Sequence, residues 1–146
     1  MEWLPHVTVA TVVEKNGKYL LVQEHSHQRL VYNQPAGHLE ANETLQEAAI
    51  RETLEETGWL VKPKGVVGLA LYTSPHNQVT YHRTTFYAEA ISHDPKQNLD
   101  EGIEKVVWMS YEEMLASAAE MRSELVIKTV EQYRNQHCYP LEIIFT

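Results

Sequence analysis

The sequence lacks the features that mark secreted and membrane-bound proteins. Its single cysteine, Cys138, cannot form an intramolecular disulfide, which predicts a reducing compartment. No apolar run approaches the roughly 18 residues that a membrane-spanning helix needs. No Lys or Arg precedes Lys15, so we expect no signal peptide. Together these absences predict a cytoplasmic protein that does not bind membranes.

Basic residues are also scarce. Twelve Lys and Arg face twenty Asp and Glu, so the formal net charge is −8. Proteins that coat nucleic acids or anionic membranes need a basic surface, and we therefore expect neither kind of partner. The excess acid either is spread over the surface for solubility or is concentrated where it does chemistry.

The chain of 146 residues, 43% of them hydrophobic, is predicted to form one domain over residues 1–146. Asn16-Gly17 predicts a hairpin turn, and Asn42 and Gly58 are expected to cap the two ends of a helix. Periodicity and turn signals predict strands at 7–13, 19–23, 61–72, 79–91 and 106–109, helices at 41–57, 111–120 and 123–135, and a loop at 25–36. This mixture indicates an α/β or α+β sandwich.

The predicted helix over 41–57 carries an unusual group of acids near its end. Glu52, Glu55 and Glu56 stand at i, i+3 and i+4, so their carboxylates share one face. They repel one another, and they oppose the helix dipole at the C-terminus. A divalent cation would reverse both effects, and carboxylate oxygens suit Mg²⁺ or Mn²⁺ better than Zn²⁺. The alternative is a solvated helix face without a metal.

The surrounding residues resemble the Nudix box. Gly37 is followed after five residues by Glu43, and after seven more by Arg51-Glu52-Thr53-Leu54-Glu55-Glu56-Thr57-Gly58-Trp59. The resemblance implies a MutT-like Nudix hydrolase: an α/β/α sandwich with a mixed sheet, in which the box forms a loop–helix–loop. It implies metal ligation by Glu52, Glu55, Glu56 and the carbonyl of Ala36, and structural roles in the box for Gly37, Glu43, Arg51 and Gly58. The chain departs from the usual pattern at Ala36, where the family often has glycine, and at Thr53, where it has a hydrophobic residue.

Four further segments resemble one subgroup of that family, the NudJ-type phosphatases. They are residues 6–10, 33–41, 122–126 and 139–142. The resemblance implies Mg²⁺-dependent release of orthophosphate from nucleoside tri- and diphosphates and from thiamine-related diphosphates, namely hydroxymethylpyrimidine pyrophosphate and thiamine diphosphate. Two alternatives stay open: a pyrophosphohydrolase of a nucleoside diphosphate derivative, and a non-catalytic Nudix module that binds a metabolite.

Hydrolysis at phosphorus needs a base that accepts the proton of the attacking water. Glu56 and Glu55 are the candidates within the helix, and Glu52 is a further catalytic carboxylate. Family members often draw another carboxylate from the loop before the last strand, which here is residues 99–104. The sequence does not choose among Asp100, Glu101 and Glu104, and each is equally well explained as part of a solvated loop.

Substrate contacts are predicted from residue chemistry. Arg83 suits bidentate phosphate binding, with a structural ion pair as the equal alternative. His38 follows the box glycine and is a candidate for the phosphates, and Glu101 is a further substrate-binding candidate. Tyr32 and Tyr81 either stack on a heterocycle or pack in the core. The expected partners are small phosphorylated metabolites or nucleotides, and the sequence leaves open whether the protein is a monomer or a homodimer.

Overall fold

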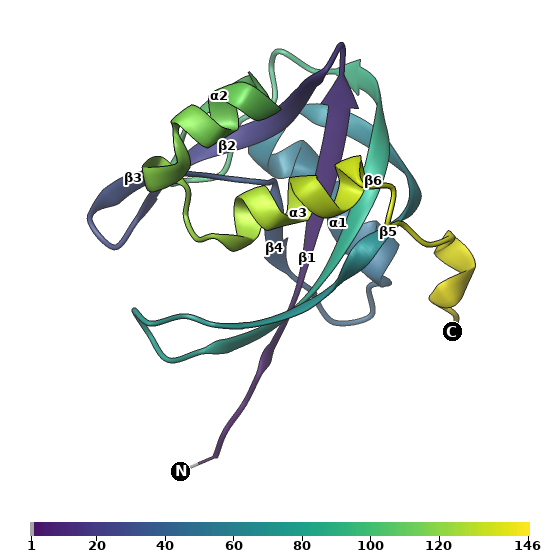
Figure 1. Cartoon of the computed structure of the whole chain (residues 1–146). Helices are drawn as coiled ribbons and strands as arrows, with labels where there is room; N and C mark the ends of the chain where they lie inside the picture. The colour runs from purple at the N-terminus through teal and green to yellow at the C-terminus, as the bar shows by residue number, and fades with distance from the viewer. Residues whose placement is uncertain (1) are drawn as a thin grey trace.

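A computed structural model describes residues 2–146 as one mixed sheet flanked by helices (Figure 1). The strands follow the order β3-β2-β1-β6-β5, with β4 also paired to β1 and β7 to β2. Their bounds are β1 His6–Lys15, β2 Lys18–Ser26, β3 Arg29–Asn33, β4 Ala36–His38, β5 Trp59–Thr73, β6 Thr80–His93 and β7 Ile103–Ser110. The helical segments are α1 Leu45–Thr57, α2 Tyr111–Ala116, η1 Ala118–Glu120, α3 Leu125–Arg134 and η2 Leu141–Ile143. The predicted α+β sandwich is confirmed.

Strand β1 lies in the middle of the sheet. It runs parallel to β6, with Val9 opposite Thr84, and antiparallel to β2 and β4. Residues 8–13 of β1 are buried on both faces of the sheet, as is typical of a central strand covered on both sides, whereas Val7 near its start is exposed. This burial is possible because helices pack on the two faces.

The helices form two outer layers. In Figure 1, α3 lies in front of the sheet and α1 behind it. Val9 and Phe86 pack with Ala48 and Ala49 of α1, whereas Val12 packs with α2 and α3 in a separate cluster. Because side chains alternate along a strand, Val9 and Val12 point to opposite faces, and two hydrophobic layers result. None of the helices within residues 2–146 has the length and hydropathy of a membrane span.

The hairpin between β1 and β2 was predicted, but the hairpin between β2 and β3 was not. Asn16 and Gly17 have positive φ angles of 53° and 76°, as the tight turn between β1 and β2 requires. The predicted loop over 25–36 is wrong, because residues 29–33 form β3, paired to β2. The turn between them uses His27 and Gln28, at φ 48° and 66°. Neither residue is a usual turn signal, and the pairing to β2 is what holds this polar segment as a strand.

Helix α1 starts three residues beyond the predicted cap. Thr44 Oγ1 accepts a hydrogen bond from the Glu47 amide at 3.1 Å, and Glu47 Oε1 accepts one from the Thr44 amide at 2.8 Å. This capping box outweighs Asn42, which adopts a left-handed φ of 66° outside the helix. The predicted end is confirmed, since Gly58 caps the helix at φ 78°. The segment that resembles the Nudix box, residues 37–59, therefore forms a loop–helix–loop.

The C-terminal helices are shorter than predicted. The predicted capping box of Ser110 and Glu113 is present, but α2 ends at Ala116 and a separate 3₁₀ turn, η1, follows. Helix α3 covers most of the predicted 123–135 segment.

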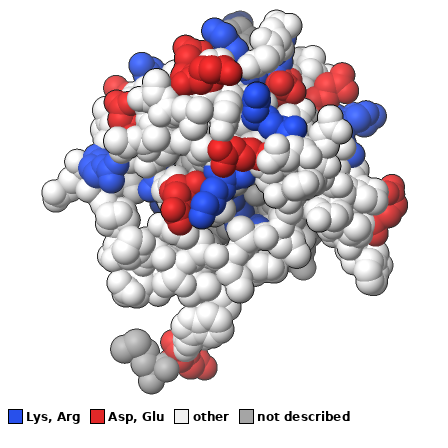
Figure 2. Space-filling view, in the orientation of Figure 1, with Lys and Arg blue, Asp and Glu red and all other residues white. Residues whose placement is uncertain are grey.

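Acidic and basic side chains lie next to one another on the face shown in Figure 2, so the net negative charge does not produce a uniformly acidic surface there.

Candidate active site

Helix α1 and strand β4 together place Glu56. Its side chain points from the last turn of α1 toward β4 and is only 8% exposed. Glu56 Oε1 accepts a hydrogen bond from the backbone amide of Ala36 at 2.9 Å. Ala36 is held in turn by the pairing of β4 with β1, so the central strand determines where this carboxylate lies.

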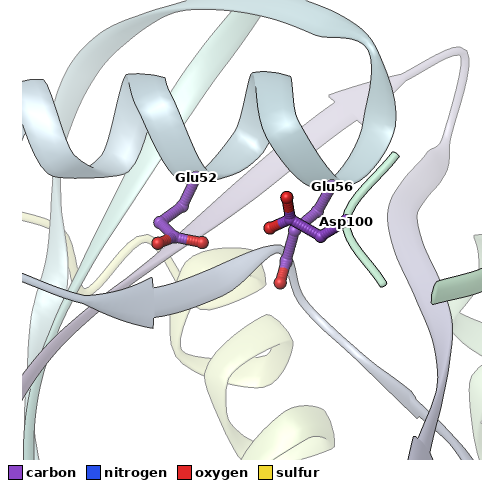
Figure 3. A group of neighbouring side chains, drawn as sticks. All are labelled: Glu52, Glu56 and Asp100. Carbon is purple, nitrogen blue, oxygen red and sulfur yellow. The ribbon is translucent and has the colours of Figure 1, made fainter. Parts of the chain in front are cut away.

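Glu52, Glu56 and Asp100 form one carboxylate cluster. One oxygen of each lies within 4.8 Å of the other two, and Figure 3 shows the two helix side chains and the loop side chain converging. The loop is held close because the Asp100 amide donates to the backbone carbonyl of Glu55 at 3.0 Å. Of the three loop acids that the sequence left open, Asp100 is the one that joins the cluster. Glu101 is exposed, and Glu104 lies 3.1 Å from His25 Nε2.

The electrostatics of this cluster favour a cation. Burial raises the pKa of Glu56 to about 9, against the hydrogen bond from Ala36, which lowers it. Burial also raises the pKa of Glu52, with the Arg51 guanidinium acting against it, and the pKa of Asp100, where the charge of Glu55 adds to the effect. In all three groups the pKa is raised, so the protein itself does not fully compensate the negative charge that this cluster would carry when ionised.

Arg51 organises a second set of acids beside the cluster. Its Nε donates to Glu43 at 2.6 Å, and its Nη1 donates to Glu52 at 2.7 Å and to Glu55 at 2.8 Å. These contacts lower the pKa of Glu43 and raise that of Arg51. A further bond from Nη2 to the His38 carbonyl, at 3.0 Å, ties the helix to the end of β4. The Glu55 carboxylate faces Arg51 and is not one of the three clustered carboxylates.

Gly37 makes room for Glu52. A Cβ atom at position 37 would collide with the Glu52 carboxylate, so a side chain at this position would force that carboxylate to move away from where it lies. The donor set that results consists of carboxylate oxygens, which are the hard ligands that Mg²⁺ and Mn²⁺ prefer. The residues present therefore fit a divalent cation of this kind.

A pocket of about 400 Å³ opens beside the cluster. Glu52 and Glu56 line it, as do three of the predicted substrate residues, His38, Tyr81 and Arg83. The structure does not bring the other two to this pocket. Tyr32 packs against the core cluster under α2 and α3, and Glu101 lies in the exposed turn before β7.

One wall of the pocket is aromatic. His6 Nδ1 lies 3.0 Å from His38 Nε2, and both rings make edge contacts with Tyr81 at centroid distances of 5.6 and 6.2 Å. Burial, helped by the neighbouring His6 and Arg122, lowers the pKa of His38. Sequence reasoning missed a further aromatic contact, the stack of His27 on His76 at 4.4 Å, which joins the β2–β3 and β5–β6 turns at the pocket. No sequence pattern links these two histidines.

Comparisons with known proteins agree with this architecture. The NUDIX domain family model matches residues 4–130. Phosphatase NudJ from Escherichia coli strain K12 is 42% identical over 140 residues, which cover 96% of this chain and 90% of that protein. A NUDIX hydrolase structure from Nitrosomonas europaea superposes with a TM-score of 0.95 and 42% identity, covering 98% of this chain and 97% of the other. The MutT protein from Methanosarcina mazei Go1 has a TM-score of 0.76 at 18% identity, covers 94% of this chain and 98% of that one, and so shares the fold.

The sandwich, its acidic helix and these relatives define a phosphohydrolase that acts on diphosphate substrates. The chain belongs to the Nudix family, and within it the chain is similar to the NudJ phosphatases.

Proposed function

We propose that this protein is a Mg²⁺-dependent phosphatase that releases orthophosphate from nucleoside tri- and diphosphates and from thiamine-related diphosphates, with Mn²⁺ as an alternative metal. The observation that carries the proposal is the 42% identity to Phosphatase NudJ over 96% of the chain. The intact carboxylate cluster beside an open pocket supports it. We also propose that residues 1–146 act as a single domain in the cytoplasm on small phosphorylated metabolites.

Glu52, Glu56 and Asp100 would hold the cation, and the carbonyl of Ala36 and the carboxylate of Glu55 are further proposed ligands. A bound Mg²⁺ supplies charge neutralisation on phosphate oxygens and lowers the pKa of bound water. Gly37, Glu43, Arg51 and Gly58 would keep the box in shape: Gly37 by admitting Glu52, Gly58 by ending the helix, and Arg51 with Glu43 by orienting carboxylates.

Among the carboxylates, we propose Glu56 as the base that accepts the proton of the attacking water. It lines the pocket, whereas Glu55, the other base candidate, faces Arg51. The backbone amide of Ala36 fixes one Glu56 oxygen, and a bound cation would keep the carboxylate ionised so that it could accept a proton. Substrate heterocycles would meet Tyr81 and His38 on the aromatic wall.

The test is a screen in which each product is identified, with nucleoside triphosphates, nucleoside diphosphates and the two thiamine-related diphosphates as substrates. Orthophosphate as the product in Mg²⁺, with no turnover after EDTA, is the expected result. Inorganic pyrophosphate or a split diphosphate bridge would instead identify a pyrophosphohydrolase. Binding without turnover of any phosphate anhydride would identify a non-catalytic module.

A further inference from the structure

Arg83 differs from every other Lys and Arg that the structure describes, because it alone is buried, with 8% of its surface exposed. It lies in β6, between β1 and β5 in the sheet, and lines the same pocket as Glu52 and Glu56. Guanidinium groups are rarely buried unless an acid pairs with them, since removing the charge from water is costly.

The contacts of Arg83 do not supply such an acid. Its Nη2 donates to Thr129 Oγ1 at 2.9 Å and to Gln34 Oε1 at 3.3 Å, and both acceptors are neutral. Its Nε is sealed from solvent and has no hydrogen-bond partner. Within residues 2–146, Nη1 donates to no protein group and no carboxylate forms an ion pair with this side chain. The structural ion pair that the sequence allowed is therefore absent.

The charged residue that acts on the Arg83 guanidinium is Arg122, which is also positive and therefore repels it. Burial, together with the positive charge of Arg122, lowers the pKa of Arg83 to about 10, so the side chain is still cationic at neutral pH. Arg122 also lines the pocket, and its own charge is compensated by Glu24, at 2.6 Å. The Arg83 charge is left without a counter-ion at the pocket.

We propose that Arg83 is a substrate-binding residue whose guanidinium binds an oxyanion of the substrate, a phosphate group other than the one held at the carboxylate cluster. This inference rests on the proposed function, which supplies a substrate with at least two phosphates. A phosphate would provide the missing negative charge, and the free Nη1 would supply a charge-assisted hydrogen bond.

Calorimetric titration of the full chain with inorganic pyrophosphate in Mg²⁺ buffer tests the assignment. Arg83→Met should weaken pyrophosphate binding by about tenfold to a hundredfold, as expected for a lost hydrogen bond to a charged group. Arg83→Lys keeps the charge without the planar fork and should lose less. Arg134→Met is the matched control, since Arg134 is exposed and lies against Tyr111 outside this pocket.

Wild-type pyrophosphate affinity in folded Arg83→Met overturns the inference, as does a wild-type protein that does not bind pyrophosphate. If Arg83→Met does not fold, Arg83→Lys decides, because unchanged affinity in that variant contradicts phosphate binding through the guanidinium fork. Failure of the proposed function gives a different result: pyrophosphate binding that depends on Arg83, without release of orthophosphate from any tested anhydride.

Discussion

The carboxylate of Glu52 occupies the space in which a Cβ atom of residue 37 would lie, so Gly37 and Glu52 cannot both keep their positions if the glycine gains a side chain. Gly37→Ala should therefore displace Glu52 from the cluster. We expect turnover to fall at least about tenfold, because small displacements of positioned groups cost large rate factors. Steady-state kinetics over a range of Mg²⁺ concentrations measures the effect.

Gly68→Ala is the control for this prediction. A Cβ at position 68 would meet only Gln132 Nε2, at 3.9 Å, which is an ordinary contact. Gly68→Ala should keep wild-type turnover. Equal activity of the two alanine variants would show that the close approach of Gly37 to Glu52 has no bearing on catalysis.

Glu56→Gln separates chemistry from stability. Glutamine keeps the size of the side chain and can still accept from the Ala36 amide, but it removes the charge and the base. Turnover at saturating Mg²⁺ should drop by about 10²-fold or more. The thermal midpoint in EDTA should not fall, because the wild-type carboxyl group must take up a proton on folding at neutral pH and glutamine removes that cost. Glu112→Gln, on the exposed face of α2, is the control. Turnover of Glu56→Gln close to that of the control would refute the assigned base.

Stability of the metal-free protein should depend on pH in an unusual direction. The pKa of Glu56 rises from 4.5, its ordinary value, to about 9 on folding. Between these values the folded protein binds more protons than the unfolded chain, so the free energy of unfolding decreases as pH rises. In EDTA, the thermal midpoint should be lower at pH 8 than at pH 5.5.

Mg²⁺ should counter this loss, because it binds ionised carboxylates that only the folded chain brings together. The increase in midpoint on adding Mg²⁺ should accordingly be greater at pH 8 than at pH 5.5. Glu56→Gln should flatten the dependence on pH in EDTA. A pH slope that persists unchanged in this variant would assign it to other groups.

Asp100 and Glu101 are adjacent in sequence but differ in position. Asp100→Asn should weaken Mg²⁺ binding about tenfold, since it removes one of three clustered carboxylates, while the exposed Glu101→Gln should have the affinity of the wild type. Mg²⁺ titrations followed by calorimetry compare the two variants. The opposite ranking would show that the loop rearranges when the metal binds.

Much of the fold and of the site could be predicted from local sequence. The box spacing predicts that Glu52 and Glu56 share a helix face, and Gly58 ends that helix because a left-handed residue is needed there. Strand β3 could not be predicted in this way, since its turn uses His27 and Gln28 and its pairing depends on β2.

The features that local sequence does not predict are contacts between segments far apart in the chain. The sequence offered three loop acids of equal standing, and the bond from the Asp100 amide to the Glu55 carbonyl brings Asp100 to the cluster. The surroundings of Arg83 depend on Thr129 of α3 and on Gln34, which local patterns do not connect with β6. Local signals thus predict which face of α1 is acidic, but not what lies opposite it.

The parallel pairing of β1 with β6 also has a consequence for biosynthesis. The residues that position Glu56 are translated early, yet β1, on which β4 depends, cannot gain its parallel neighbour until the ribosome has passed residue 88. Asp100 emerges later still. A nascent chain therefore leaves the β6-facing edge of β1 without its partner strand until β6 has been made, and metal binding at the proposed site would mark a chain whose long-range pairing is complete.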